Sequence, residues 1–181
     1  VRICGKDVRS YALEELRQFV GVVPQRASLV TGTIADNLRW GNPDADTAEL
    51  EQACKIAQAW EFVSQTPQGL ETPVTQGGRS LSGGQKQRLT IARAMVGAPK
   101  LLILDDSMSA LDYATDLALR RALAEKMQDV TKIVISQRAT SIQHADHILV
   151  MEDGKCVGYG THEELLVQCP VYAEIFQTQM Q

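Results

Sequence analysis

Residues 81–106 read LSGGQKQRLTIARAMVGAPKLLILDD, and this stretch decides the fold class. A serine and two glycines come first, and the apolar residues that follow recur on one side of a helix (Leu89, Ala92, Met95 and Val96). After Pro99, the apolar run Leu101–Leu104 is short enough for a strand that is buried on both faces. A helix followed by a buried strand that ends in two aspartates indicates an α/β domain.

The same alternation continues on both sides of this stretch. It comprises a buried strand at 20–24, a helix from about 112 to 127, a buried strand at 132–136, a hairpin over 147–159 and a capped helix after Thr161. Strands that alternate with helices predict an α/β fold with a mainly parallel sheet. Residues 27–97 read as mostly helical, and they are predicted to be an insertion into that sheet.

Composition and charge exclude several classes of protein. The chain has 181 residues, of which 44% are hydrophobic and 22% charged, and this balance excludes disorder or a coiled coil for the whole chain. A net charge of −4 disfavours a general nucleic-acid binder. The four cysteines form no CxxC pair and no zinc spacing, and no apolar run approaches the ~20 residues of a membrane helix.

Two short motifs carry residue types suited to phosphate chemistry. Glycines at a helix start leave backbone N–H groups free for a phosphate, and the Ser82 hydroxyl can donate as well. The alternative is an ordinary glycine turn with a serine cap. Asp105 and Asp106 follow a buried strand, where one carboxylate can hold Mg²⁺ and the other can orient a water. The alternative there is a pair of caps in a strand–helix loop.

Other residues that could be read as ligands have plainer interpretations. The basic residues Lys86, Arg88 and Arg93 favour a solvated helix face with local ion pairing over contact with a partner's phosphate. Trp40 and Trp60 favour core packing over stacking on a base.

The order and spacing of these motifs resemble the nucleotide-binding domain of ABC transporters. The resemblance rests on LSGGQ-x-QR-x-x-x-AR at 81–93, LLILDD at 101–106 and SALD at 109–112. Gln25, which follows the strand VGVVP, resembles the Q-loop glutamine. GTI at 32–34 and GTHEEL at 160–165 resemble elements of exporter-type members. The implied fold is a P-loop NTPase-like α/β sheet with an inserted helical subdomain.

The resemblance implies a role for each motif residue. In this family two such domains close head to tail around two ATP molecules, and the signature motif of one contacts the γ-phosphate and ribose of ATP held by the other. The signature residues here are Ser82, Gly83, Gly84 and Gln85. Asp105 would hold Mg²⁺, Gln25 would join the magnesium shell, and Asp112 would lie in the D-loop that crosses between the sites. ATP and Mg²⁺ are therefore the implied cofactors.

Three departures from the family pattern qualify that implication. No G-x-x-x-x-G-K-[ST] occurs in the chain, so we expect it to be truncated before the Q-loop, with the P-loop absent, and to be inactive in isolation. Asp106 stands where the family has the glutamate that polarises the attacking water, and Gln137 stands where it has the switch histidine. Two substitutions at the catalytic positions of one site predict a degenerate site, like that in one subunit of bacterial heterodimeric multidrug exporters. A slow homodimer is the alternative.

The sequence therefore predicts an ATPase domain of an exporter of drugs or lipid-like compounds, at the cytoplasmic face of the cell membrane. Its expected partners are a second nucleotide-binding domain, in a heterodimer, and the transmembrane domain of the same polypeptide, with no nucleic acid. The expected parts are a partial ATPase core (1–26 and 98–165), a helical subdomain (27–97) and a C-terminal helix (166–181). Alternative functions are a soluble ABC ATPase in DNA repair or translation, and a non-hydrolysing allosteric subunit that only holds nucleotide.

Overall fold

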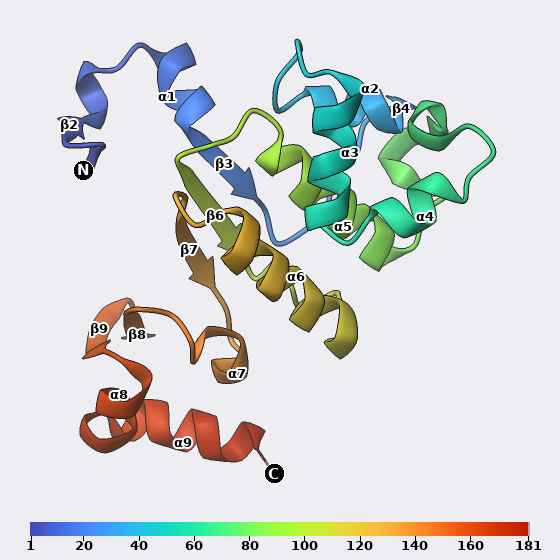
Figure 1. The fold of residues 1–181 in the computed structure, drawn as a ribbon. Coiled ribbons are helices and arrows are strands. Elements are labelled where there is room, and N and C mark those ends of the chain that lie inside the picture. The colour runs from blue at the N-terminus through green and yellow to red at the C-terminus, as the bar shows by residue number, and fades with distance from the viewer. Residues whose placement is uncertain (181) are drawn as a thin grey trace. The chain divides into compact units, whose positions relative to one another are not determined.

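The computed structural model describes residues 1–180, which fall into two compact units (Figure 1). The first unit spans Val1–Ile135 and the second begins at Ser136. The buried apolar cluster of the first unit runs from Val23 to Met127. A separate cluster around Ile148 and Leu165 belongs to the second unit, so each unit has its own core.

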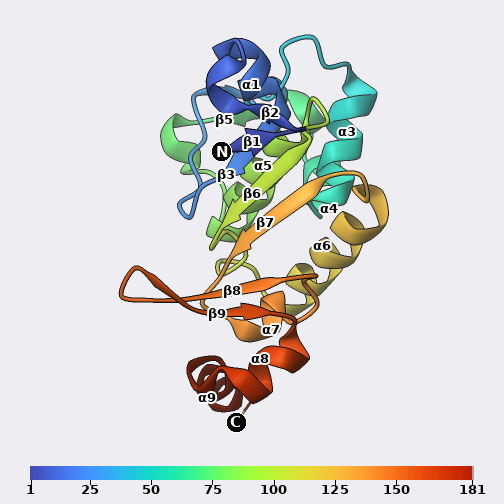
Figure 2. The same ribbon diagram turned by 90° about the vertical axis from the view of Figure 1, so that its left-hand side faces the viewer.

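The first unit contains a three-stranded parallel sheet. Its strands lie in the order β3 (Val20–Val23), β6 (Leu101–Asp105) and β7 (Thr131–Ile135), as Figure 2 shows. Val23 pairs with Leu104, and Asp105 pairs with Ile135, so the carboxyl ends of all three strands lie along one edge. The predicted α/β fold with a parallel sheet is confirmed.

The two faces of this sheet differ in burial. Leu102 and Leu104 are fully buried on one face, where β3 approaches helix α5 (Gly83–Met95) so closely that a Cβ on Gly21 would collide with a helix carbonyl. On the other face Val22 is 54% exposed and Ile133 46% exposed. Burial on both faces is therefore wrong for Val22 of β3 and Ile133 of β7.

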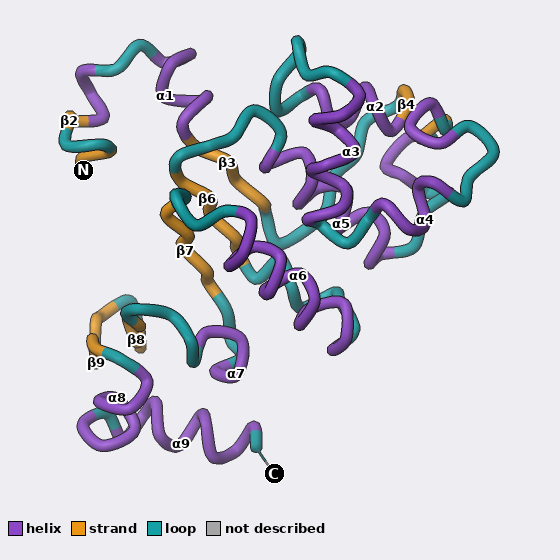
Figure 3. The backbone as a smooth tube through the Cα atoms, viewed as in Figure 1, coloured by secondary structure: helices purple, strands orange, loops and turns teal. Residues whose placement is uncertain are grey.

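Helices dominate the chain between β3 and β6 (Figure 3). They are α2 (Ile34–Arg39), α3 (Thr47–Ile56), α4 (Trp60–Ser64) and α5, with 3₁₀ turns η2 (Gly69–Glu71) and η3 (Gln76–Gly78). Two short strands, β4 (Gly32–Thr33) and β5 (Pro73–Val74), pair antiparallel within this stretch. Helices α2, α3 and α5 each begin at a capping box, in which two side chains satisfy otherwise free backbone N–H groups.

The remaining elements are the first ones in the sequence, the helix between β6 and β7, and everything after β7. The first unit also has β1 (Arg2–Ile3), β2 (Lys6–Asp7), η1 (Val8–Ser10), α1 (Leu13–Phe19) and α6 (Tyr113–Lys126). The second unit has α7 (Ala139–Ile142), the predicted hairpin of β8 (Ile148–Glu152) and β9 (Lys155–Gly160), α8 (His162–Gln168) and α9 (Pro170–Gln179). Within residues 1–180, no helix combines the length and the apolar character needed to cross a bilayer.

The two tryptophans have different surroundings. Trp60 packs partly buried against the core, as expected, and Lys55 Nζ lies 5.4 Å from its ring centroid. Trp40 is 67% exposed, so core packing is wrong for this residue. At the next position the backbone of Gly41 lies so close to the carbonyls of Arg93 and Val96 that an added Cβ would collide with them, so the chain contacts α5 there through backbone and not through the Trp40 ring.

Candidate functional site

The carboxyl ends of β3 and β6 bring together residues that are 81 positions apart in the chain. Gln25 follows β3 and Asp106 follows β6, and the two strands are neighbours. Gln25 Nε2 donates a hydrogen bond to Asp106 Oδ2 at 3.1 Å. Open α/β sheets bind ligands outside the carboxyl ends of their strands, so this contact lies where a ligand is expected.

Asp106 is held firmly by its backbone. Its φ of +43° lies in the left-handed region, which aspartate tolerates better than most residues. Its N–H donates to the Ile135 carbonyl at 2.8 Å, and its own carbonyl accepts from Ser109 Oγ at 2.8 Å. The direction of the Asp106 side chain is therefore set by strands β6 and β7 and by the turn after them.

The two aspartates suit a magnesium ion that retains water. Asp105 is exposed at the end of β6, and Asp106 is half-buried beside it. No group of three or more His, Cys, Asp or Glu residues able to hold a metal occurs in residues 1–180. Mg²⁺ commonly binds through one or two carboxylates together with water and substrate phosphates, so this donor set fits it better than it fits a metal that needs an all-protein cage.

The tip of α5 is the second part of the site. Ser82 caps the helix, with its Oγ accepting from the Gln85 N–H at 3.2 Å and its own N–H donating to Gln85 Oε1 at 2.9 Å. Ser82 and Gly83 are exposed. The start of this 13-residue helix carries the positive end of the helix dipole, which favours an anion.

Neither backbone conformation nor close packing within residues 1–180 requires glycine at the two glycine positions of this tip. Gly83 and Gly84 belong to a helix and neither has a positive φ. A Cβ on Gly83 would meet nothing within 4 Å, and one on Gly84 would lie 3.6 Å from the Ala110 carbonyl, an ordinary contact. Glycine in a helix costs roughly 1 kcal/mol relative to alanine. The absence of side chains at this tip therefore leaves room for a group from outside the chain.

Asp112 begins the helix that follows this loop. Its carboxylate accepts from the Thr115 N–H at 3.0 Å and from the Thr115 hydroxyl at 2.7 Å, and it is exposed. The backbone and side-chain hydrogen bonds from Thr115 hold the pKa of Asp112 below its usual value. Asp112 is thus a helix cap in this structure, beside the loop that carries Ala110.

We expect Asp112→Ala to lower the melting temperature, because α6 loses both bonds at its N-terminus. A lowered folded pKa means that the stabilisation is fully present above the ordinary carboxyl pKa of about 4 and is lost as pH falls through the folded value. Thermal unfolding at about pH 7 and about pH 3 should therefore show a smaller difference from the unmodified protein at the lower pH. Asp112→Asn, which keeps an acceptor oxygen, is the control, and an equal difference at both pH values would contradict this role.

Gln137 belongs to the second unit, two positions after the end of β7. Its side chain is exposed, and its carbonyl accepts from Gln179 Nε2 at 2.8 Å. Gln179 Oε1 also accepts from the Ala139 N–H at 2.8 Å, so the α9 residue holds the backbone on both sides of Arg138. An exposed amide at this position can donate a hydrogen bond but cannot carry a proton.

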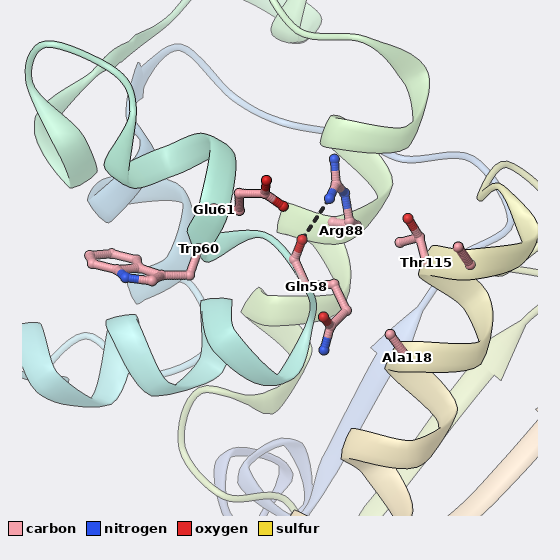
Figure 4. Close-up of a pocket in the computed structure, with 7 residues that line it drawn as sticks. Gln58, Trp60, Glu61, Arg88, Thr115 and Ala118 are labelled. Carbon is pink, nitrogen blue, oxygen red and sulfur yellow. Dashed lines mark hydrogen bonds between the residues drawn. The ribbon is translucent and has the colours of Figure 1, made fainter.

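The sequence predicts a solvated helix face for the basic residues of α5, and this is wrong for Arg88 and Arg93. Arg88 Nη1 donates to the Gln58 carbonyl at 2.6 Å and its guanidinium lies 4.9 Å from the Phe62 ring centroid. Figure 4 shows Arg88 reaching toward Gln58 in a pocket that Trp60 and Thr115 also line. Burial lowers the pKa of Arg93. Both arginines are therefore partly enclosed, and the salt bridges found within residues 1–180 involve neither of them.

Sequence reasoning also missed Gln87. It is only 2% exposed, and its Nε2 lies 3.5 Å from the Pro24 carbonyl, a long hydrogen bond. This contact joins α5 to the segment that carries Gln25. Hydrophobic periodicity could not identify Gln87 as buried, because α5 is enclosed on more than its apolar face. The polar residue Thr90 is buried as well.

Residues 1–109 match the sequence model of the family described as ABC transporter. The chain is 47% identical over 99% of its length to an uncharacterized ABC transporter ATP-binding protein of Mycobacterium tuberculosis H37Rv, and covers 31% of that protein. It is 44% identical over 97% of its length to an ATP-dependent lipid A-core flippase of Chromohalobacter salexigens, of which it covers 30%.

A solved structure shows the same fold. The chain superposes on a bacterial Atm1-family ABC exporter with ATP bound, with a TM-score of 0.93 and 36% sequence identity. The match covers 99% of this chain and 32% of the exporter chain. The 181 residues thus span about a third of the length of the proteins that they match.

Proposed function

From the premise that this chain belongs to the ABC transporter family, we propose that it is the ATP-binding part of an exporter and donates its signature motif to ATP held by a partner domain. Ser82, Gly83, Gly84 and Gln85 would contact that ATP at its γ-phosphate and ribose. The observation that carries the proposal is the exposed tip of α5, where two glycines leave space that the chain does not need for its own packing.

The chain's own nucleotide site is proposed to lie at the carboxyl ends of β3 and β6. Asp105 would hold Mg²⁺ and Gln25 would complete its shell, while Mg²⁺ would neutralise charge on the phosphates. The phosphate-binding P-loop for this nucleotide would come from a part of the full-length protein outside the 181 residues. Asp112 would lie in the loop that crosses between the two sites.

This own site is proposed to be degenerate. Asp106 has one methylene fewer than the glutamate that would orient the attacking water, and Gln137 cannot carry a proton as a histidine can. A displacement of the order of 1 Å can cost ~10²-fold in rate. We therefore propose a heterodimer, in which the intact signature motif completes a competent site on the partner while this site turns over slowly.

The proposed organisation follows the same assignment. Residues 27–97 would form the helical subdomain that carries the signature motif, and residues 1–26 and 98–165 would contribute to the ATPase core, with a C-terminal helix at 166–181. The domain would lie at the cytoplasmic face of the cell membrane, joined to a transmembrane domain of the same polypeptide. An ATP-dependent lipid A-core flippase and a β-(1→2)glucan export ATP-binding/permease protein among the relatives support an exporter of drugs or lipid-like compounds over a soluble repair or translation ATPase.

Nucleotide binding and hydrolysis by the full-length protein test this function. We expect it to bind Mg²⁺-ATP, to hydrolyse it slowly alone, and to turn over faster when its partner subunit is present. Absence of ATP binding would contradict the exporter assignment. Binding without any hydrolysis at either site would instead support an allosteric nucleotide-holding subunit, and a rate that the partner leaves unchanged would favour a homodimer.

A further inference from the structure

We propose that Gln179 is a positioning residue for Gln137, whose side chain would meet the terminal phosphate in the proposed function. The Gln179 side chain forms two hydrogen bonds of 2.8 Å: its Nε2 donates to the Gln137 carbonyl, and its Oε1 accepts from the Ala139 N–H. These two bonds are called the clamp below. The clamp belongs to the folded chain itself, and only its consequence for nucleotide rests on the proposed function.

The amide of Gln179 is matched to the backbone that it holds. A glutamine side chain offers an acceptor oxygen and an NH₂ donor, and the clamp uses both. The two backbone groups belong to the peptide units before and after Arg138. Because the first of these units also contains the carbonyl of Gln137, the clamp restricts the backbone rotation that sets the direction of the Gln137 side chain.

The clamp adds a long-range contact to a turn that is otherwise bonded locally. The Arg138 N–H donates to Ser136 Oγ at 3.0 Å, and the Arg138 carbonyl accepts from the Ser141 N–H at 3.0 Å. Gln179, in contrast, lies 40 positions after Ala139. Local bonds define the shape of this turn, and the clamp fixes the turn against α9.

The face of α9 that carries Gln179 is firmly anchored. Tyr172, Phe176 and Gln179 lie at positions i, i+4 and i+7, so they share one side of the helix. Tyr172 is 2% exposed, and its hydroxyl lies 2.8 Å from His162 Nδ1. The Phe176 ring meets the His162 ring edge to face, with the centroids 4.8 Å apart. The start of α8 therefore holds the helix face from which Gln179 reaches the turn.

Burial on the other side of the contact supports the same conclusion. Ala139, the first residue of α7, is 3% exposed and belongs to the same buried cluster as Tyr172. Gln137, two positions earlier, is exposed. Packing thus fixes Ala139, whereas the exposed Gln137 depends on the clamp for its backbone orientation.

This orientation has a consequence for nucleotide in the proposed function. The Gln137 amide can donate a hydrogen bond to a phosphate oxygen. If its backbone is free, the side chain must be ordered when the ligand binds, and this ordering weakens binding. ADP lacks the terminal phosphate, so loss of the clamp should affect the binding of ATP and spare the binding of ADP.

Hydrogen–deuterium exchange of the Ala139 amide in the full-length protein tests the clamp. Gln179→Ala should raise its exchange rate by roughly 3- to 10-fold, as expected for loss of one hydrogen bond. Gln179→Met keeps the length of the side chain without its amide, and it should give the same increase. Gln177→Ala is the matched control, because it removes an exposed glutamine side chain from the same helix and leaves the clamp in place.

A double-mutant cycle on nucleotide binding tests the positioning role. Binding of Mg²⁺-ATP and Mg²⁺-ADP is measured on the full-length protein without its partner, so that only this chain's own site contributes. Gln179→Ala should weaken ATP binding by roughly 3- to 10-fold and leave ADP binding unchanged. In a Gln137→Ala background it should have no further effect on ATP binding, because no amide remains to be positioned.

The outcomes separate this inference from the proposed function. An Ala139 exchange rate that Gln179→Ala leaves unchanged would overturn the clamp. Unchanged ATP affinity, an equal loss of ATP and ADP affinity, or the same loss in the Gln137→Ala background would overturn the positioning role. Absence of ATP binding in the unmodified protein would contradict the proposed function and the consequence for nucleotide, while a raised Ala139 exchange rate would still support the clamp.

Discussion

Full-length protein carrying both Asp106→Glu and Gln137→His is expected to hydrolyse ATP at its own site roughly 10²-fold faster than the unmodified protein. The glutamate moves the carboxylate outward by one methylene, toward the water that it must orient. In the proposed function, the histidine would add a group that can be protonated near neutral pH and can interact with the terminal phosphate. General bases placed in this way contribute 10²- to 10⁴-fold, so two partly restored groups give at least the lower figure.

Backbone strain at position 106 does not cancel the rate gain expected from Asp106→Glu. Asp106 has a φ of +43°, a conformation that suits aspartate better than glutamate because a short polar side chain can bond locally. The difference is expected to cost below ~1 kcal/mol, since both residues carry most of the same penalty. A rate gain of about 10² corresponds to about 2.7 kcal/mol, so the catalytic effect is larger.

The measurement is ATP turnover in the full-length pair, with the partner's own catalytic carboxylate replaced so that only this site contributes. Each single substitution is a control and should give a smaller gain than the double variant. Unchanged turnover in the double variant would show that the two positions are not what limits this site.

Gly84→Ala is expected to lower partner-dependent ATP hydrolysis by about 10²- to 10³-fold while leaving the protein as stable as before or more so. Position 84 is the second residue of α5, and an added Cβ meets only an ordinary contact with Ala110. Alanine in a helix is favoured over glycine by roughly 1 kcal/mol. Loss of activity together with retained stability would thus place the effect outside the chain, at a phosphate that approaches the bare backbone.

The chain offers a matched control for this substitution. Ala48 is the second residue of α3, which also begins at a capping box, and it is exposed. Ala48→Gly should lower stability by roughly 1 kcal/mol and leave hydrolysis unchanged. Thermal unfolding and steady-state ATPase assays of both variants are the measurements. Full activity in Gly84→Ala would contradict a nucleotide at this tip.

Much of the fold could be predicted because its signals are local. The apolar runs at 20–23 and 101–104 became β3 and β6, and the pattern from Leu89 to Met95 became α5, because side-chain periodicity is a property of neighbouring residues. Capping at Ser82 and Thr161 was readable for the same reason, since each capping box spans four residues.

Burial was predicted less well, because it depends on what lies across from a residue. Ile133 and Val22 are residue types typical of buried strands, yet they are 46% and 54% exposed. Arg88 has the spacing of a surface residue, but its guanidinium donates a hydrogen bond to the carbonyl of Gln58, 30 positions earlier in the chain, and is therefore partly enclosed.

Residue types and their order along the chain were enough to establish an α/β fold, a helix tip suited to phosphate and a pair of aspartates at a strand end, because each of these depends on contacts within a few residues. The meeting of Gln25 with Asp106, the left-handed backbone of Asp106 and the spare room beside Gly83 and Gly84 became known from the folded chain. These features arise from strand pairing and packing across long separations, and no local pattern specifies such a register.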